Sequence, residues 1–186
     1  MQTSDAIVIG GSAGSLEVLL KILPLLKANL RFTLIIVLHR KAGADEILTD
    51  LFSGRTKLPV REAQEKEVIK KGVIYLAPSD YHLLIEKSGT FSLDHSEKIN
   101  YSRPSIDVTF ESAADVFKDK TIGILLSGAN ADGVAGLKRI KNMGGRVVIQ
   151  DPATAKVPYM PEQAKLQVKY DALLGQEALA DWINNL

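Results

Sequence analysis

The stretch AIVIGGSAGS, residues 6–15, decides how the rest of the chain is interpreted. Four apolar residues with the pattern of a buried strand lead into a Gly-x-Ser-x-Gly turn at residues 10–14. An apolar helical pattern begins directly afterwards, near Ser15. This is the local pattern of a nucleophile elbow, a sharp strand-to-helix turn that presents a serine hydroxyl at the end of a parallel sheet. Ser12 is therefore a candidate nucleophile.

The same glycines could belong to a nucleotide-binding loop. The dinucleotide fingerprint requires glycine at its first, third and sixth positions. Counted from Gly10 or from Gly11, the third and sixth positions hold serine, alanine or leucine, so neither register fits. A plain tight turn, in which the serine only caps the following helix, is the alternative that stays open at this point.

Apolar runs alternate with helical patterns along the chain. Strands are expected at residues 32–38, 72–78, 122–126, 147–149 and 172–174, and helices from Ser15 to about Pro24 and at 45–52, 107–117, 134–142 and 176–183. This alternation predicts an α/β fold with a doubly wound, mostly parallel sheet flanked by helices. Residues 82–86 and 90–94 flank Lys87-Ser88-Gly89 and predict an antiparallel β-hairpin attached to that sheet. A length of 186 residues suits a single domain, residues 1–186.

Composition excludes several classes of function. A formal net charge of +1 argues against a nucleic-acid partner, which usually requires a basic excess. The absence of cysteine excludes disulfides, thiolate catalysis and Cys-ligated zinc. No segment approaches the ~20 apolar residues of a membrane-spanning helix, and the N-terminus lacks the basic region of a signal peptide. We therefore expect a cytoplasmic protein without membrane insertion.

Two further polar residues follow predicted strands. His39 comes directly after residues 32–38, and Asp132 follows residues 122–126 after a few loop residues. The carboxyl ends of parallel strands share one edge of the sheet, so both side chains should lie near Ser12. A serine, a histidine and an aspartate together are the set that acyl transfer requires.

Each of these residues also has a simpler interpretation. A lone histidine is commonly structural, and Asp132 has the position of a helix N-cap. The order Ser, His, Asp also differs from the Ser, Asp, His order of α/β-hydrolases. We expect His82 and His95, which lie in a hairpin strand and a polar stretch, to be ordinary surface or turn residues.

Taken in order, several segments resemble the catalytic domain of the chemotaxis receptor protein-glutamate methylesterases, the CheB family. The segments that carry the resemblance are IVIGGSAG (7–14), LH (38–39), YLAP (75–78), SRPSID (102–107), SGANADG (127–133), QDP (150–152) and MPEQA (160–164). The resemblance implies a doubly wound fold with a hairpin, and it identifies Ser12, His39 and Asp132 as the catalytic triad.

The resemblance also implies an activity. It implies a serine esterase that hydrolyses glutamyl γ-methyl esters on the cytoplasmic region of methylated chemoreceptors, can deamidate glutamine, and needs no metal or organic cofactor. Backbone N–H groups near Ala13 and Ala129 are the expected oxyanion donors. Arg40, Lys41 and Arg103 would lie near the cleft, where a basic rim would attract a glutamate-rich receptor. Solvated loop charges are the alternative interpretation of Arg40 and Lys41.

Some positions depart from the family pattern. The family's Ser-Thr-Gly-Gly is replaced by Ser-Ala-Gly-Ser at residues 12–15, Ala129 replaces a methionine, and Leu38 replaces a glutamine. The alternative function is therefore a non-catalytic or altered-substrate signalling module that keeps the triad by descent. The sequence starts at the serine-bearing strand, without the receiver domain and linker common in the family. We accordingly expect an activity that does not respond to a phosphodonor.

Overall fold

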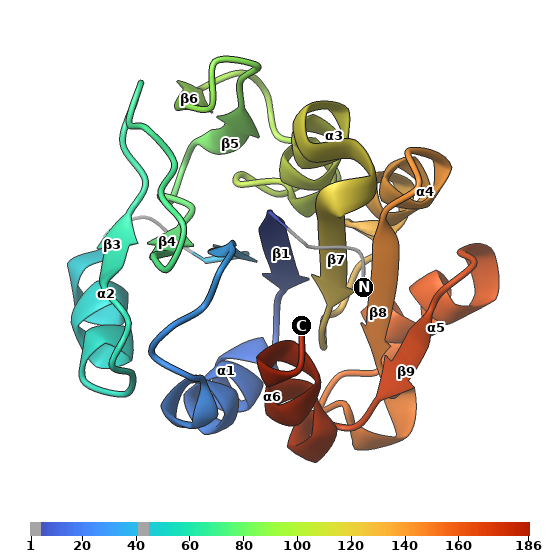
Figure 1. Ribbon diagram of the computed structural model, residues 1–186. Coiled ribbons are helices and arrows are strands. Elements are labelled where there is room, and N and C mark those ends of the chain that lie inside the picture. Colours follow the sequence, from blue (N-terminus) through green and yellow to red (C-terminus); the bar gives the residue numbers. More distant parts are fainter. Residues whose placement is uncertain (1–4, 41–44) are drawn as a thin grey trace.

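The computed structural model describes residues 5–40 and 45–186 and contains a seven-stranded parallel sheet (Figure 1). The strand order is β3-β4-β2-β1-β7-β8-β9. The strands are β1 (Ala6–Gly11), β2 (Thr33–Leu38), β3 (Val60–Glu62), β4 (Ile74–Leu76), β7 (Thr121–Leu125), β8 (Arg146–Gln150) and β9 (Ala172–Leu174). The helices are α1 (Ser15–Ile22), α2 (Asp45–Ser53), α3 (Ile106–Phe117), α4 (Val134–Asn142), α5 (Tyr159–Gln167) and α6 (Gln176–Asn184). The doubly wound prediction is confirmed.

Strand β1 lies at the point where the chain changes direction across the sheet. From β1 the chain builds β2, β3 and β4 on one side and then β7, β8 and β9 on the other. A crevice forms outside the carboxyl ends of the strands at such a switch point, and it is the usual ligand site of this class of fold. Because β1, β2 and β7 run parallel, the loops that follow them all begin at this edge of the sheet.

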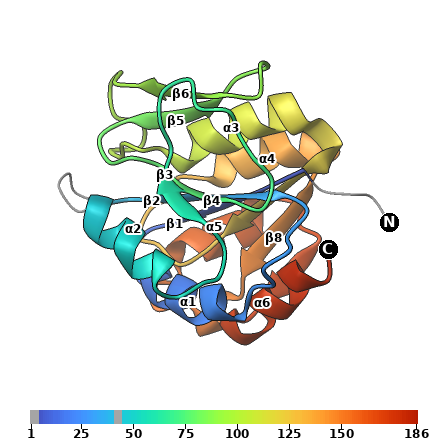
Figure 2. The same cartoon turned by 60° about the vertical axis from the view of Figure 1, so that its left-hand side comes forward.

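Two apolar layers cover the sheet because its central strands are apolar on both faces. In β1, Ile7 and Ile9 face one layer, which contains α1, α2 and α6, whereas Val8 faces the other, which contains α3, α4 and α5. Figure 2 shows α3, α4 and the hairpin above the sheet, and α1 and α6 below it. The uninterrupted Ile, Val and Leu runs of the sequence reflect this burial on both faces.

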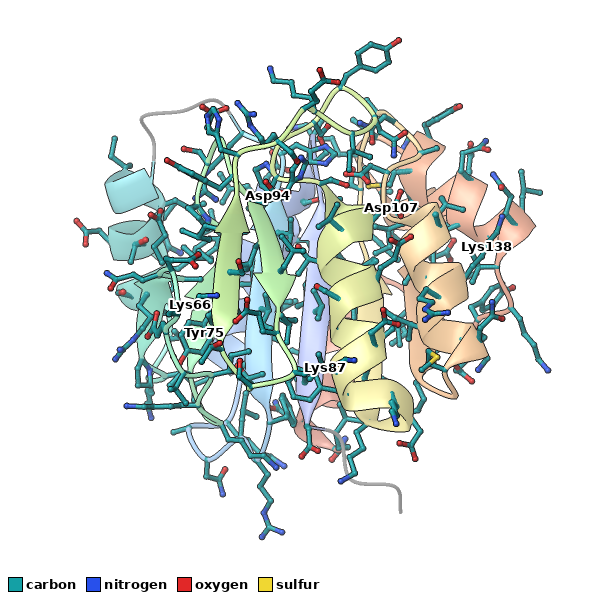
Figure 3. The ribbon with its side chains drawn as sticks, turned by 90° about the horizontal axis from the view of Figure 1, so that it is seen from above. Lys66, Tyr75, Lys87, Asp94, Asp107 and Lys138 are labelled. Carbon is teal, nitrogen blue, oxygen red and sulfur yellow. The ribbon has the colours of Figure 1, made fainter. Side chains whose placement is uncertain are left out.

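The predicted hairpin is present as β5 (His82–Ile85) and β6 (Phe91–Asp94). It forms a separate two-stranded sheet rather than an extension of the parallel one. The hairpin packs over the face that carries α3 (Figure 3), and Phe91 contacts Tyr75 of β4 edge to face at 4.8 Å between ring centroids. The hairpin thus acts as part of the covering layer.

Two elements were not predicted, β3 and α5. Strand β3 has only three residues, too few to show a period, and lies at the edge of the sheet. Helix α5 contains Pro161, but the proline occupies the first turn, where the backbone needs no intrahelical N–H bond. Pro24 likewise does not stop the first helix abruptly, since the chain continues as a 3-10 turn over Leu23–Leu25.

Candidate active site

The turn after β1 presents Ser12 at the carboxyl edge of the sheet. The N–H of Ser12 donates to the carbonyl of Ser127, at 2.9 Å, and to Oγ of Ser15, at 3.1 Å. The left-handed residue of this turn is Gly14, with φ 86°, while Ser12 does not have a positive φ. The left-handed conformation that this sharp turn requires therefore falls on the glycine and not on the serine.

Ser127, after β7, fastens this turn to the neighbouring loops. Its carbonyl accepts the Ser15 hydroxyl at 2.6 Å, and its own hydroxyl donates to the carbonyl of Ala13 at 2.7 Å and accepts the N–H of Val157 at 2.9 Å. Among the described residues, nothing accepts a hydrogen bond from the N–H of Ala13 or Ala129. These two N–H groups stay available, as an oxyanion donor requires.

His39 and Asp132 meet across the ends of β2 and β7. Nε2 of His39 lies 2.7 Å from Oδ2 of Asp132. The imidazole is mostly buried and the carboxylate is fully buried. The two residues are 93 positions apart in the chain, and the central strands bring them together.

The Asp132 carboxylate is held by the N-terminus of α3 as well as by the histidine. The N–H groups of Ile106 and Asp107 donate to it at 2.7 and 3.1 Å, and Oγ of Ser105 donates at 2.9 Å. Burial opposes ionisation, but the hydrogen bonds from His39 and from the backbone N–H groups outweigh it and lower the pKa of Asp132. The positive end of the helix dipole acts in the same direction.

An ionised Asp132 determines which nitrogen of His39 carries the proton. A carboxylate only accepts hydrogen bonds, so Nε2 is the N–H and Nδ1 is the acceptor of the neutral ring. Nδ1 lies 3.3 Å from Oγ of Ser102, a weak contact. Ser12 lines the same pocket as His39, but its hydroxyl forms no hydrogen bond with the described side chains. Contacts between a nucleophile and its base commonly tighten when substrate binds.

Two pockets adjoin at His39 and form the cleft. One, of about 260 Å³, is mostly apolar and is lined by Ser12, Leu16, Leu38, His39, Arg40, Ile47, Leu48 and Leu51. The other, of about 490 Å³, is polar and is lined by His39, Arg40, Asp80, Lys98, Tyr101, Ser102 and Arg103. The imidazole therefore stands between an apolar and a polar compartment.

Arg103 borders the polar pocket but is bound to internal partners. Its Nε and Nη2 donate to Oδ1 of Asp80 at 3.1 and 2.7 Å, and its Nη1 donates to the carbonyls of His95 and Ser96 at 3.1 and 2.6 Å. Its side chain is only 13% exposed. The same contact with Arg103 lowers the pKa of Asp80. This arrangement holds the loop of residues 95–105 in place.

Arg40 is similarly engaged. Its Nη2 donates to the carbonyl of Ala77 at 2.8 Å and lies 3.6 Å from Oε2 of Glu62, and its side chain is 11% exposed. Lys41 lies outside the described residues. The geometry of the two arginines differs from the exposed basic rim that the sequence suggested, because both guanidinium groups are committed to protein acceptors.

The prediction that His82 is an ordinary surface or turn residue is wrong. The side chain is buried, its Nδ1 accepts the N–H of Ser105 at 3.1 Å, and its Nε2 donates to the carbonyl of Glu97 at 2.9 Å. The Ser105 hydroxyl in turn donates to Asp132. His82 therefore helps to position the residue that binds the Asp132 carboxylate. His95 is exposed beside Asp80, as expected. No sequence signal separates the two histidines, because only the packing of the 95–105 loop buries one of them.

The part of the chain that the structure describes holds no group of three or more His, Cys, Asp or Glu side chains placed to bind a metal ion. None of its helices is long and apolar enough to cross a membrane.

The parallel sheet defines a doubly wound α/β domain. Its candidate site lies beside the carboxyl ends of the central strands, which is where enzymes of this class bind their ligands. The profile of the CheB methylesterase family matches residues 7–183. The chain belongs to the CheB methylesterase family, which is a family of enzymes.

Similar proteins agree with this assignment. The crystal structure of the Thermotoga maritima CheB methylesterase catalytic domain superposes with a TM-score of 0.94 at 33% identity, covering 99% of each chain. A Leptospira interrogans protein named for protein-glutamate methylesterase/protein-glutamine glutaminase is 46% identical over 95% of this chain and 92% of its own length. The full-length Thermotoga maritima protein-glutamate methylesterase/protein-glutamine glutaminase is 38% identical over 84% of this chain but only 46% of its own length.

Proposed function

We propose that this chain is a cytoplasmic serine esterase that hydrolyses glutamyl γ-methyl esters on chemoreceptors and deamidates receptor glutamines. The observation that carries the proposal is the 2.7 Å contact between His39 and the buried Asp132, at the edge of the sheet where Ser12 shares a pocket with His39. A buried carboxylate that fixes an imidazole beside a serine is the arrangement that activates a serine nucleophile. The names of the similar proteins supply the substrate class.

Acylation uses the unprotonated Nδ1 of His39 as the base. The Ser12 oxygen attacks the γ-carbonyl carbon while Nδ1 takes the hydroxyl proton, and Asp132 stabilises the imidazolium that forms. The N–H groups of Ala13 and Ala129 receive the oxyanion, and each contributes about 3 kcal/mol to the transition state. The bond to the methoxy group then breaks, and the imidazolium returns the proton so that methanol leaves.

Deacylation repeats these steps with water. His39 takes a proton from the attacking water, the ester bond to Ser12 breaks, and the proton passes to the serine oxygen. The product is a glutamate side chain and the enzyme is regenerated. With glutamine as substrate the first leaving group is ammonia and the acyl-enzyme is the same.

The test is release of methanol from a methylated receptor fragment by the purified chain, together with labelling by a fluorophosphonate probe. We expect methanol in proportion to enzyme and time, and one label per chain, because both need an activated serine. A non-catalytic signalling module would bind the fragment but release no methanol and take no label. That result would reject the proposed activity while leaving the family assignment intact.

Replacing Arg103 with glutamine tests whether this residue holds the loop or steers the substrate. A loop-holding role predicts that kcat/KM falls by a similar factor, about three- to tenfold, on a receptor fragment and on a small neutral ester. The reason is that the loop carries Ser102, which contacts His39. Steering by a rim charge acts on association and is screened by salt, so it would lower the rate on the receptor alone.

The comparison is made at low and high salt with both substrates. A loss that is confined to the receptor fragment and disappears at high salt would restore the basic-rim interpretation of Arg103. Unfolding by urea completes the experiment and measures how much the Arg103–Asp80 pair contributes to the free energy of unfolding.

A further inference from the structure

A second buried carboxyl group, that of Asp107, lies beside the His39–Asp132 pair. Asp107 is the second residue of α3 and occupies the end of that helix next to α4 (Figure 3). Its Oδ1 accepts the N–H of Gly136, in the first turn of α4, at 2.7 Å. Its Oδ2 accepts a hydrogen bond from Nδ2 of Asn100 at 3.2 Å.

The two carboxyl groups cap each other's helices. Asp132 precedes α4 and accepts N–H groups from the start of α3, whereas Asp107 belongs to α3 and accepts an N–H group from the start of α4. The helices can approach this closely because Gly136 has no side chain, and a Cβ there would lie 2.4 Å from Cβ of Phe110. Any displacement of Asp107 therefore shifts the N-terminal turn of α3, which holds the Asp132 carboxylate.

Asn100 connects the same pair to the other side of the imidazole. Its Nδ2, besides reaching Asp107, lies 3.5 Å from Oδ1 of Asp132. Its carbonyl accepts the hydroxyl of Ser102, which faces Nδ1 of His39. Asn100 has a φ of 50°, a left-handed conformation that asparagine tolerates better than most residues. Through Asn100, Asp107 is thus connected to the groups that contact both ring nitrogens of His39, namely Asp132 and Ser102.

The charge of Asp107 changes in the neutral pH range. Burial, and then the negative charge of Asp132, raise the pKa of Asp107 to about 7 against the opposing effect of the Gly136 N–H. Glu111, one turn further along α3, is the other acid that faces it, and its pKa is also raised, by burial and by Asp115. Asn100 and the α4 backbone contribute neutral donors.

We propose that Asp107 is a positioning residue of the esterase site, whose carboxyl group fixes Asp132 and whose charge adjusts how strongly His39 holds its proton. The inference rests on the proposed role of His39 as the base. When Asp107 is ionised, a second negative charge lies behind Asp132 and favours the imidazolium. When Asp107 is neutral, the imidazole gives up its proton at lower pH and is ready to act as a base.

The test replaces Asp107 with asparagine, which keeps the size and an oxygen acceptor for Gly136 but removes the charge. The matched control is Glu111→Gln, the same chemical change one turn away on α3, where the structure shows no hydrogen bond to Asp132 among the described residues. The measurements are the pH profile of kcat/KM on a small neutral ester and the pH midpoint of the His39 ring signal in NMR. The second needs no catalysis, so it remains decisive if the proposed function fails.

In Asp107→Asn we expect the inflection that ionisation of Asp107 adds to the His39 signal and to the rate profile to disappear, because the asparagine carries no charge at any pH. Glu111→Gln should keep that inflection and leave the midpoints of both within about 0.2 unit. A variant profile and midpoint that coincide with the wild type would overturn the proposal, even if overall activity falls. If the variant does not fold, the wild type decides the question, because its His39 signal should show a second inflection where the Asp107 carboxyl carbon titrates. A single inflection in the His39 signal of the wild type would also reject the proposal.

Discussion

Replacing Ser12 with alanine is expected to lower methanol release by about 10⁴–10⁶-fold and to abolish fluorophosphonate labelling. The attacking oxygen is lost, and the remaining oxyanion donors and binding contacts sustain only a small residual rate. The fold should be unaffected, because the structure shows no hydrogen bond from the Ser12 hydroxyl to a described side chain. Methanol assays and thermal unfolding of the variant measure both effects.

The matched control for this experiment is Ser102→Ala. The Ser102 hydroxyl lies 3.3 Å from Nδ1 of His39, whereas the structure shows no hydrogen bond between the Ser12 hydroxyl and a described side chain. We expect the Ser102 variant to keep the label and to lose less than about tenfold in rate, since Ser102 only orients the ring. If Ser102→Ala abolished labelling while Ser12→Ala kept it, the nucleophile would be Ser102 and the proposed mechanism would be wrong.

The second large effect is expected from Asp132→Asn, which should lower kcat by about 10³–10⁴-fold. The asparagine amide can donate toward Nε2 of His39, which favours the tautomer with the proton on Nδ1, where a proton acceptor is needed. The amide also leaves fewer acceptors for the N–H groups of Ile106 and Asp107. Steady-state kinetics on a small ester measure the loss, with fluorophosphonate labelling rates as an independent readout.

The contribution of the Asp132 carboxylate to stability should depend on pH. The pKa of Asp132 is lowered in the folded state below the unfolded reference of 3.8, so the native state binds fewer protons there than the unfolded state. The stabilisation is therefore present above about pH 4 and is lost as the pH falls through the folded-state value. Urea unfolding at pH 7 and pH 3 should show a larger difference between wild type and variant at pH 7. An equal or larger difference at pH 3 would contradict this role of the carboxylate.

Patterns of apolar residues along the chain were sufficient to predict the sheet and most of its helices. Buried parallel strands require unbroken apolar runs, and the helices that cover them require apolar residues at helical spacing, so both leave local signals. The hairpin was predicted for the same reason, but its separation from the main sheet depends on packing against α3. Strand β3 and helix α5 lacked such signals, one through shortness and the other through a proline in its first turn.

The candidate site likewise combines residues that the sequence predicted with contacts that only the structure revealed. Ser12, His39 and Asp132 were found because each follows a strand, and parallel strands end at one edge. The sequence did not indicate that Arg103 binds Asp80, 23 positions away, or that His82 receives the N–H of Ser105 at the same separation. Both pairings depend on how the 95–105 loop folds back onto the cleft.

The sequence by itself therefore determined the α/β class, the family and the edge of the sheet that carries the polar residues, because periodicity, turns and strand ends are local properties. Only the tertiary structure decided which nitrogen of His39 faces Asp132 and which arginines are committed to internal acceptors. It also revealed that Asp107 caps α4 while Asp132 caps α3. A buried polar group must find its hydrogen-bond partner wherever packing brings one near, and that partner is set by elements far away in the chain.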